Sequence, residues 1–144
     1  MSYISHKKIH SLNILEVVTP EVLSKLRRES FCTIVPNIYL PNNDDFEAFC
    51  FATIEAGIDS SIVLASDYQG ISDALRDGLL GYLSSPSNTE SWRKTIDSVL
   101  KISPTERQLV IKERFQIVYE ELNWELIIEK TKKLHLNLLE NVNE

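Results

Sequence analysis

The sequence predicts an α/β fold in which a parallel sheet is covered by helices on both faces. Four short apolar segments, near residues 12–18, 31–35, 62–65 and 81–83, have the composition of strands. Segments with helix start signals or with apolar residues at helical spacing lie between and after them. Strands and helices that alternate in this way form a parallel sheet between helices. The 144 residues are enough for one such domain with a buried core.

The composition is that of an ordinary globular protein and argues against several other classes. Hydrophobic residues make up 43% of the chain and charged residues 25%, as in average domains. The net charge of −6 argues against nucleic acid as a partner, because a nucleic-acid binder needs a basic surface. We find neither a membrane-length apolar segment nor a signal-peptide core. Cys32 and Cys50 lie in apolar segments without metal-like spacing, which indicates a reducing compartment and no metal site. We expect a cytoplasmic location and no cofactor.

The first segments of the chain predict a strand followed by a helix. Residues 1–11 are polar, and the domain is expected to span residues 12–144. Thr19 and Pro20 predict the helix start, as N-cap and first helical residue. The expected buried face of this helix consists of Val22, Leu23 and Leu26.

Two adjacent arginines, Arg27 and Arg28, lie near the end of this helix. Arginine often binds phosphate, so contact with a nucleotide is one interpretation. A solvated helix face is the simpler one, and we favour it.

The central stretch, residues 31–56, predicts a buried strand, a polar loop and a helix. Pro36 and Pro41 punctuate the loop, and the asparagines and aspartates of residues 42–45 are expected to cap the helix. Apolar residues on nearly every side predict a helix that is buried all round. These residues are Phe46, Phe49, Cys50, Phe51 and Ile54.

Two glutamates, Glu47 and Glu55, lie within this apolar stretch, eight residues apart. On one helix they would face roughly the same way, about 12 Å apart along the axis. Glu47 is expected in the first turn, where free N–H groups favour a phosphate. A nucleotide sugar could place its phosphates there and its hydroxyl groups on both carboxylates. The spacing alone favours the alternative, two glutamates at the edges of a packed helix.

The loop over residues 66–72 is the second candidate for ligand contact. It follows the continuously apolar residues 62–65, and ligands bind at the carboxyl ends of such strands in open α/β sheets. Gly70 would let backbone approach a ligand closely. Ser72 is expected to cap a short helix over residues 73–76. Ordinary turn chemistry is the alternative explanation for this loop.

The C-terminal part predicts three helices, over residues 91–101, 104–122 and 125–142, and Asn123 and Trp124 open the last of them. Ser103 and Glu106 form a capping box at the start of the second. The last has a basic side, Lys130, Lys132 and Lys133, for which peripheral membrane contact is one interpretation and a solvated face the favoured one. The expected buried residues of the first are Trp92, Ile96, Val99 and Leu100.

Several motifs follow one another at fixed spacing. They are Glu-Ala-Phe-Cys at 47–50, Glu55, a strand ending in Ala-Ser with its loop at 63–73, and Asp-Gly-x-x-Gly at 77–81. Their order, from about residue 12 to 139, resembles the donor-binding half of GT-B retaining glycosyltransferases, the family-four group also called glycosyl transferases group 1. The resemblance implies a Rossmann-like, three-layer domain, the C-terminal half of a GT-B fold.

The resemblance also implies an activity and a set of site residues. The reaction is sugar transfer from a nucleotide-diphosphate sugar with retention, in glycan or polysaccharide biosynthesis. Glu47 is implied to be the catalytic residue near the transferred sugar, and Glu55 to accept hydrogen bonds from the ribose hydroxyls. The implied donor-binding residues are Ala48, Phe49, Cys50, Glu55, Asp67, Tyr68, Gln69, Gly70 and Ile71.

The chain also departs from the pattern of that family. Ala48 and Cys50 replace two motif glycines, Gln69 replaces a third, and Asp73 replaces a glutamate. The acceptor-binding N-terminal half and the basic start of the donor domain have no counterpart in the sequence. We therefore expect an inactive isolated chain that needs an N-terminal glycosyltransferase half, as a domain or a separate chain.

The sequence also allows two other interpretations. One is a non-catalytic relic or protein-interaction domain that kept the glycosyltransferase fold. The other, a flavodoxin-like signalling domain with Asp44 and Asp45 as an acidic pocket, fits poorly because these residues lie where helix caps are expected.

Overall fold

The computed structural model describes residues 13–38 and 47–141, and it has the predicted α/β fold. Its three strands run parallel in the order β1-β2-β3, with Thr33 opposite Val63 and Ala65 opposite Leu83. The predictions for residues 31–35, 62–65 and 81–83 are confirmed to within one residue. The strands are β1 (Cys32–Val35), β2 (Ile62–Ser66) and β3 (Tyr82–Ser84).

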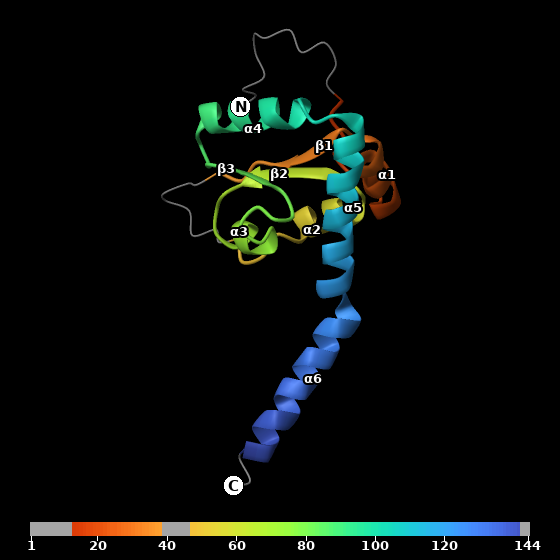
Figure 1. The fold of residues 1–144 in the computed structure, drawn as a ribbon, viewed down its shortest axis with the longest axis vertical. Coiled ribbons are helices and arrows are strands. Elements are labelled where there is room, and N and C mark those ends of the chain that lie inside the picture. Colours follow the sequence, from red (N-terminus) through yellow and green to blue (C-terminus); the bar gives the residue numbers. More distant parts are fainter. Residues whose placement is uncertain (1–12, 39–46, 142–144) are drawn as a thin grey trace.

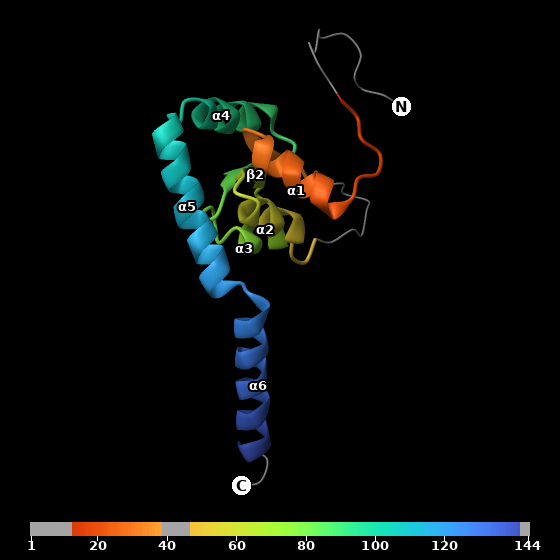
Figure 2. The same cartoon turned by 90° about the vertical axis from the view of Figure 1, so that its right-hand side faces the viewer.

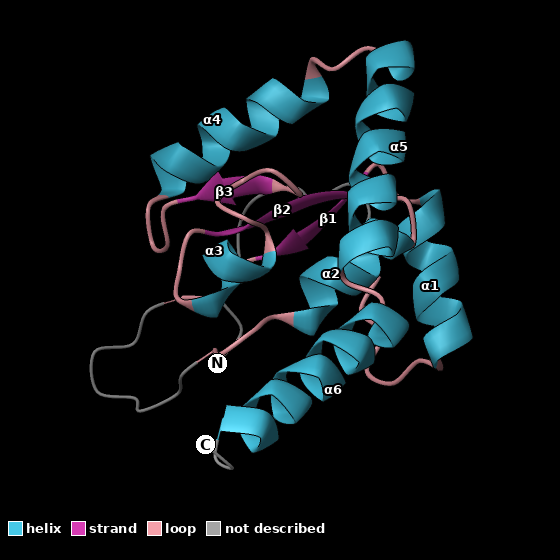
Figure 3. Ribbon diagram, turned by 60° about the horizontal axis from the view of Figure 1, so that its bottom comes forward, coloured by secondary structure: helices cyan, strands magenta, loops and turns pink. Residues whose placement is uncertain are grey.

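Helices cover both faces of the sheet and give the predicted Rossmann-like, three-layer arrangement. In Figure 3, α4 lies on one face, and α2 and α3 lie on the other. Figure 2 shows α1 beside α2. The helices are α1 (Pro20–Glu29), α2 (Phe51–Ile58), α3 (Gly70–Ala74), α4 (Thr89–Leu100), α5 (Pro104–Glu121) and α6 (Trp124–Asn141).

The side chains of the fully buried central strand β2 point alternately into two cores. Val63 and Ala65 pack with α2, α3 and Val118 of α5. Ile62 and Leu64 pack with α4 and with Ile111 of α5. Helix α5 therefore contributes to both cores, and Figure 1 shows it crossing the sheet beside β1 and β2.

The predicted helix starts are confirmed where a polar side chain caps the first turn. Thr19 Oγ1 accepts a hydrogen bond from the Val22 N–H at 3.4 Å, and Ser103 Oγ accepts one from the Glu106 N–H at 3.2 Å. Helix α4 begins two residues before the predicted start, because Asn88 provides its cap. The prediction that Ser72 caps a helix over residues 73–76 is wrong, since α3 begins at Gly70.

The predicted strand over residues 12–18 is wrong for residues 13–18, which form no strand. Ile14, Leu15 and Val17 are exposed, Val17 to 94%. A strand needs a neighbour to satisfy its backbone N–H and C=O groups, and strand propensity does not supply one. Residues 1–11, predicted as a separate polar segment, lie outside the described residues.

Three predictions of burial are also wrong. Helix α2 is buried on one face only, since Phe51 and Ile58 are exposed. Leu100 of α4 is 61% exposed, although Val99 is buried as predicted. In both α2 and α4, only one side of the helix faces the sheet. The α1 residues Val22, Leu23 and Leu26 are exposed, and polar contacts join α1 to α2 instead.

The last helix, α6, extends away from the sheet (Figures 1 and 2). Asn123 Oδ1 accepts a hydrogen bond from the Leu126 N–H at 2.8 Å, which confirms the predicted start of this helix. None of the helices in the described part of the chain is long and apolar enough to cross a membrane. Membrane contact through the lysines of α6 stays a prediction.

Candidate functional site

The carboxyl ends of the three strands meet at one edge of the sheet, where hydrogen bonds join their loops. Ser66, fully buried at the end of β2, donates its Oγ hydrogen to the carbonyl of Asn37, which follows β1. The Asp67 N–H donates to the carbonyl of Ser84 in β3 at 2.7 Å. The start of the 66–72 loop is therefore fixed from both sides.

Residues 47–48 lie directly against this loop, at Gly70. The Glu47 N–H donates to Gln69 Oε1 at 2.8 Å, and the Gly70 N–H donates to the Glu47 carbonyl at 3.0 Å. A Cβ atom on Gly70 would lie 1.9 Å from the Ala48 carbonyl oxygen. Only glycine permits this approach of two backbones. Four of the predicted site residues, Glu47, Ala48, Gln69 and Gly70, thus lie together.

The predicted position of Glu47 in the first turn of a helix is wrong, because α2 begins at Phe51 with Cys50 as its N-cap. The Glu47 carbonyl, which would accept the N–H of residue 51 in a longer helix, already accepts that of Gly70. Glu47 and Glu55 therefore do not share one helix. The asparagines and aspartates of residues 42–45, predicted as caps, lie outside the described residues.

Cys50 is buried at this N-cap, and its side chain makes no capping hydrogen bond. Its carbonyl accepts hydrogen bonds from both the N–H and the hydroxyl of Thr53. Burial raises the pKa of the Cys50 thiol above its ordinary value. Cys50 is therefore a neutral packing residue in this structure.

Gln69 has a backbone conformation that favours glycine, with φ +48°. Its side chain compensates through two hydrogen bonds: Oε1 accepts the Glu47 N–H, and Nε2 donates to the Tyr68 hydroxyl at 2.7 Å. A glutamine in place of the motif glycine therefore closes the loop with its own side chain.

Replacing Gln69 with alanine should lower the free energy of unfolding by about 1–2 kcal/mol, because the strain stays and both hydrogen bonds are lost. Gln69→Gly should lie within about 1 kcal/mol of the wild type, because relief of strain offsets the lost bonds. Urea unfolding of both variants measures the difference. A Gln69→Gly protein less stable than Gln69→Ala would contradict it.

The remaining predicted residues around the loop differ in exposure. Asp67 is exposed and accepts a hydrogen bond from the Ser72 hydroxyl at 2.7 Å. Tyr68 and Phe49 are half-buried, and the Phe49 ring meets Phe51 edge to face at 5.3 Å. Ile71 is fully buried in the core. Ile71 therefore supports the loop from below, while Asp67 and Ala48 face solvent.

Glu55 takes part in a different set of contacts, with α1. Both terminal nitrogens of Arg27 lie 3.1 Å from Glu55 Oε2, and Arg27 Nη1 lies 3.4 Å from Asp59 Oδ2. Arg28 and Ser24 also bind Asp59. The Arg27 side chain is only 12% exposed, so the prediction of a solvated face is wrong for Arg27.

Residue spacing could have indicated this network. Asp59 caps the end of α2, four residues after Glu55, and Arg27 and Arg28 lie three and four residues after Ser24 on α1. Such spacings put side chains on one face of each helix. The sequence gives no sign, however, that the two faces meet.

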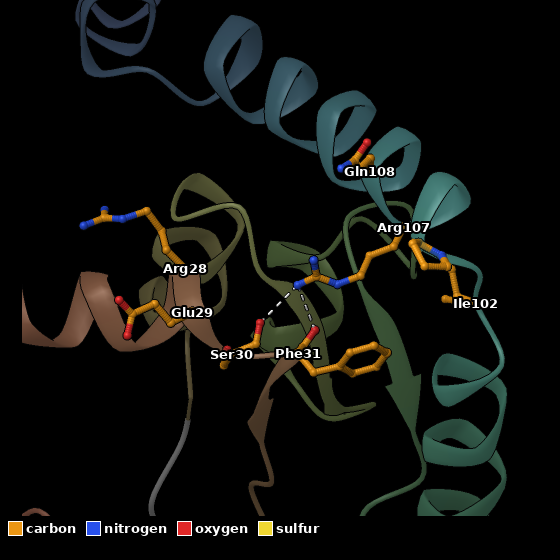
Figure 4. A pocket seen from close by; sticks show the side chains of 8 residues that line it. Arg28, Glu29, Ser30, Phe31, Ile102, Arg107 and Gln108 are labelled. Carbon is orange, nitrogen blue, oxygen red and sulfur yellow. Dashed lines mark hydrogen bonds between the residues drawn. The ribbon is translucent and has the colours of Figure 1, made fainter.

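A cavity of about 400 Å³ lies between α1, the start of β1 and the start of α5. Figure 4 shows Arg107 reaching Ser30 and Phe31, whose carbonyls accept hydrogen bonds from its Nη2 at 3.0 and 3.2 Å. Both residues precede β1, so this cavity lies at the amino end of that strand. It is therefore separate from the edge where Glu47 meets Gly70.

The described residues contain no group of three or more histidine, cysteine, aspartate or glutamate side chains that could hold a metal ion. The predictions of no metal site and no cofactor stay predictions.

The sequence matches the model of the family described as glycosyl transferases group 1 over residues 5–116. The chain belongs to the glycosyl transferases group 1 family. This assignment confirms the resemblance drawn from the motifs, and the matched region contains Glu47, Glu55 and Gly70. The parallel sheet and its helices are those of a Rossmann-like GT-B domain of this glycosyltransferase family.

The chain is similar to the lipopolysaccharide 1,2-N-acetylglucosaminetransferase of Salmonella typhimurium strain LT2. It is 29% identical over 102 residues, which cover 70% of this chain and 26% of the relative. This chain therefore spans about a quarter of the length of the relative that it matches.

Proposed function

We propose that this chain is the donor-binding part of a group 1 glycosyltransferase. It binds a nucleotide-diphosphate sugar for transfer with retention at the anomeric carbon. The observation that carries this proposal is the contact of Glu47 and Ala48 with Gly70 at the carboxyl edge of β2, the edge where open α/β sheets bind ligands. Glu47 would lie near the sugar, and Glu55 would accept hydrogen bonds from the ribose.

The name of the Salmonella relative supports a role in polysaccharide biosynthesis, since that protein transfers N-acetylglucosamine in lipopolysaccharide. Both cysteines are free in the structure, which agrees with a reducing compartment, so we place the protein in the cytoplasm.

The charge of the donor supports a partner for this chain. A diphosphate leaving group needs positive charge nearby, yet residues 36–38, 47–50, 66–72 and 85–88 contain no lysine or arginine. The cation would come from the basic start of the donor domain, supplied together with an N-terminal glycosyltransferase half, as a domain or a separate chain. The isolated 144-residue chain should therefore transfer no sugar.

A non-catalytic interaction domain is the second candidate, and one observation favours it. The backbone N–H groups of Glu47 and Gly70, which a phosphate could use, are already paired with protein oxygens.

Binding of uridine and guanosine diphosphate sugars, followed by amide chemical shifts, tests the proposal. We expect saturable shifts in residues 47–55 and 66–72, and affinity about tenfold weaker in Glu55→Ala, because a hydrogen bond to a carboxylate is lost. Glu113→Ala, an exposed glutamate on α5, is the matched control. Absence of shifts at millimolar ligand would contradict donor binding by this chain and favour the interaction domain.

A further inference from the structure

Helices α1 and α2 are joined by a network of polar side chains. Helix α1 contributes Ser24, Arg27 and Arg28, and helix α2 contributes Glu55 and its C-cap residue, Asp59. Asp59 is 11% exposed and lies within ion-pair distance of both arginines. The network therefore has a largely buried centre, Arg27 with Asp59, and an outer member, Glu55, whose side chain is 57% exposed.

Arg27 holds the carboxylate of Glu55 asymmetrically. Nη1 and Nη2 both donate to Oε2, each at 3.1 Å. Within the part of the chain that the structure describes, Oε1 of Glu55 accepts no hydrogen bond. One oxygen of Glu55 is thus fixed against the protein, and the other is free to accept a hydrogen bond from a ligand.

The stability gained from this contact is small, because exposed ion pairs are screened by water. The contact has a larger effect on the conformational freedom of the Glu55 side chain. A glutamate on a helix surface samples several rotamers, and the guanidinium of Arg27, itself held by Asp59, selects one of them. A side chain already ordered in its binding geometry loses less conformational entropy when a ligand arrives.

We propose that Arg27 is a positioning residue, which fixes Glu55 so that Oε1 accepts a hydrogen bond from a ribose hydroxyl of the bound nucleotide. This inference rests on the proposed function, in which Glu55 accepts hydrogen bonds from the ribose of the donor. Arg27 itself touches neither the sugar nor the phosphates. Its effect should therefore appear in the recognition of the ribose alone.

Arg28 provides a matched control on the same helix. It is 55% exposed and pairs with Asp59 at 3.3 Å, and it donates to the Ser24 hydroxyl. It does not contact Glu55 among the described interactions. Arg28→Gln therefore removes one guanidinium from the network and leaves the contact of Arg27 with Glu55 in place.

The test compares the affinities of the full chain for UDP and GDP with those for 2′-deoxy-UDP and 2′-deoxy-GDP, by titration followed through amide shifts. The ratio of the two affinities measures ribose recognition. A variant that is partly unfolded binds both ligands more weakly by the same factor, so this ratio is independent of the folded fraction. The proteins are the wild type, Arg27→Gln, Arg28→Gln and Glu55→Gln.

We expect the wild type and Arg28→Gln to prefer the ribonucleotide about tenfold, as for one charge-assisted hydrogen bond. Arg27→Gln and Glu55→Gln should both lose most of this preference. A wild-type preference that Glu55→Gln abolishes but Arg27→Gln retains would overturn the inference and leave the proposed function intact. Absence of nucleotide binding by the wild type would overturn the proposed function of this chain, and the inference with it.

Discussion

Replacing Gly70 with alanine should destabilise the domain by about 3 kcal/mol or more. The added Cβ atom would lie 1.9 Å from the Ala48 carbonyl oxygen, 2.3 Å from its carbon and 2.8 Å from the Glu47 oxygen. All three are backbone atoms, so a side-chain rotation cannot relieve the overlap. The two backbones would have to separate, and the hydrogen bond from the Gly70 N–H to Glu47 would be lost with them.

Gly57→Ala is the matched control for this prediction. Gly57 lies within α2, and the nearest side-chain atom to an added Cβ is Val118 Cγ2 at 3.9 Å, an ordinary contact. Alanine there should stabilise the helix by about 0.5–1 kcal/mol, because it restricts the unfolded chain. Urea unfolding of both variants measures the two changes. Equal stabilities of Gly70→Ala and the wild type would show that the close approach does not exist.

The second large effect is expected at Leu64, in the middle of the central strand. Its side chain is fully buried in the core shared with α4 and α5. Leu64→Ala should lower the free energy of unfolding by about 2–5 kcal/mol, because apolar contacts are lost and a cavity remains. Chemical denaturation measures this change.

Leu100→Ala is the control for Leu64, since it removes the same atoms from a side chain that is 61% exposed. It should change the free energy of unfolding by no more than about 0.5 kcal/mol. If Leu100→Ala cost as much as Leu64→Ala, the assignment of α4 faces would be wrong.

The elements that the sequence predicts correctly depend on local signals. Runs of apolar residues mark β1, β2 and β3. The side chains of Thr19 and Ser103 bind the backbone only three residues further on, at the starts of α1 and α5. Such signals need no knowledge of the rest of the fold.

The elements that the sequence predicts wrongly depend on distant partners. Residues 13–18 have strand composition but no neighbouring strand in the structure. The start of α2 is set by the hydrogen bond between Glu47 and Gly70, which are 23 residues apart. The partnership of Arg27 with Glu55 spans 28 residues. No local pattern carries this information.

In the candidate site, too, local motifs were informative and contacts between distant residues were not predictable. The motifs identify the family and select Glu47, Gln69 and Gly70, which the structure brings together. They do not show that the Gln69 side chain occupies the Glu47 N–H, because that depends on the positive φ of Gln69. Family resemblance therefore selected residues that lie together, but it did not predict the hydrogen bonds between them.

The double hydrogen bonding between residues 47 and 69–70 also limits how this edge can move. Neither segment can swing outward alone, since each is tied to the other and the 66–72 loop is tied to β1 and β3 through Ser66 and Asp67. A small ligand would thus bind to an edge whose backbone is already fixed, and not to a loop that folds over it. Any larger change of shape at this edge would therefore require both segments to move together.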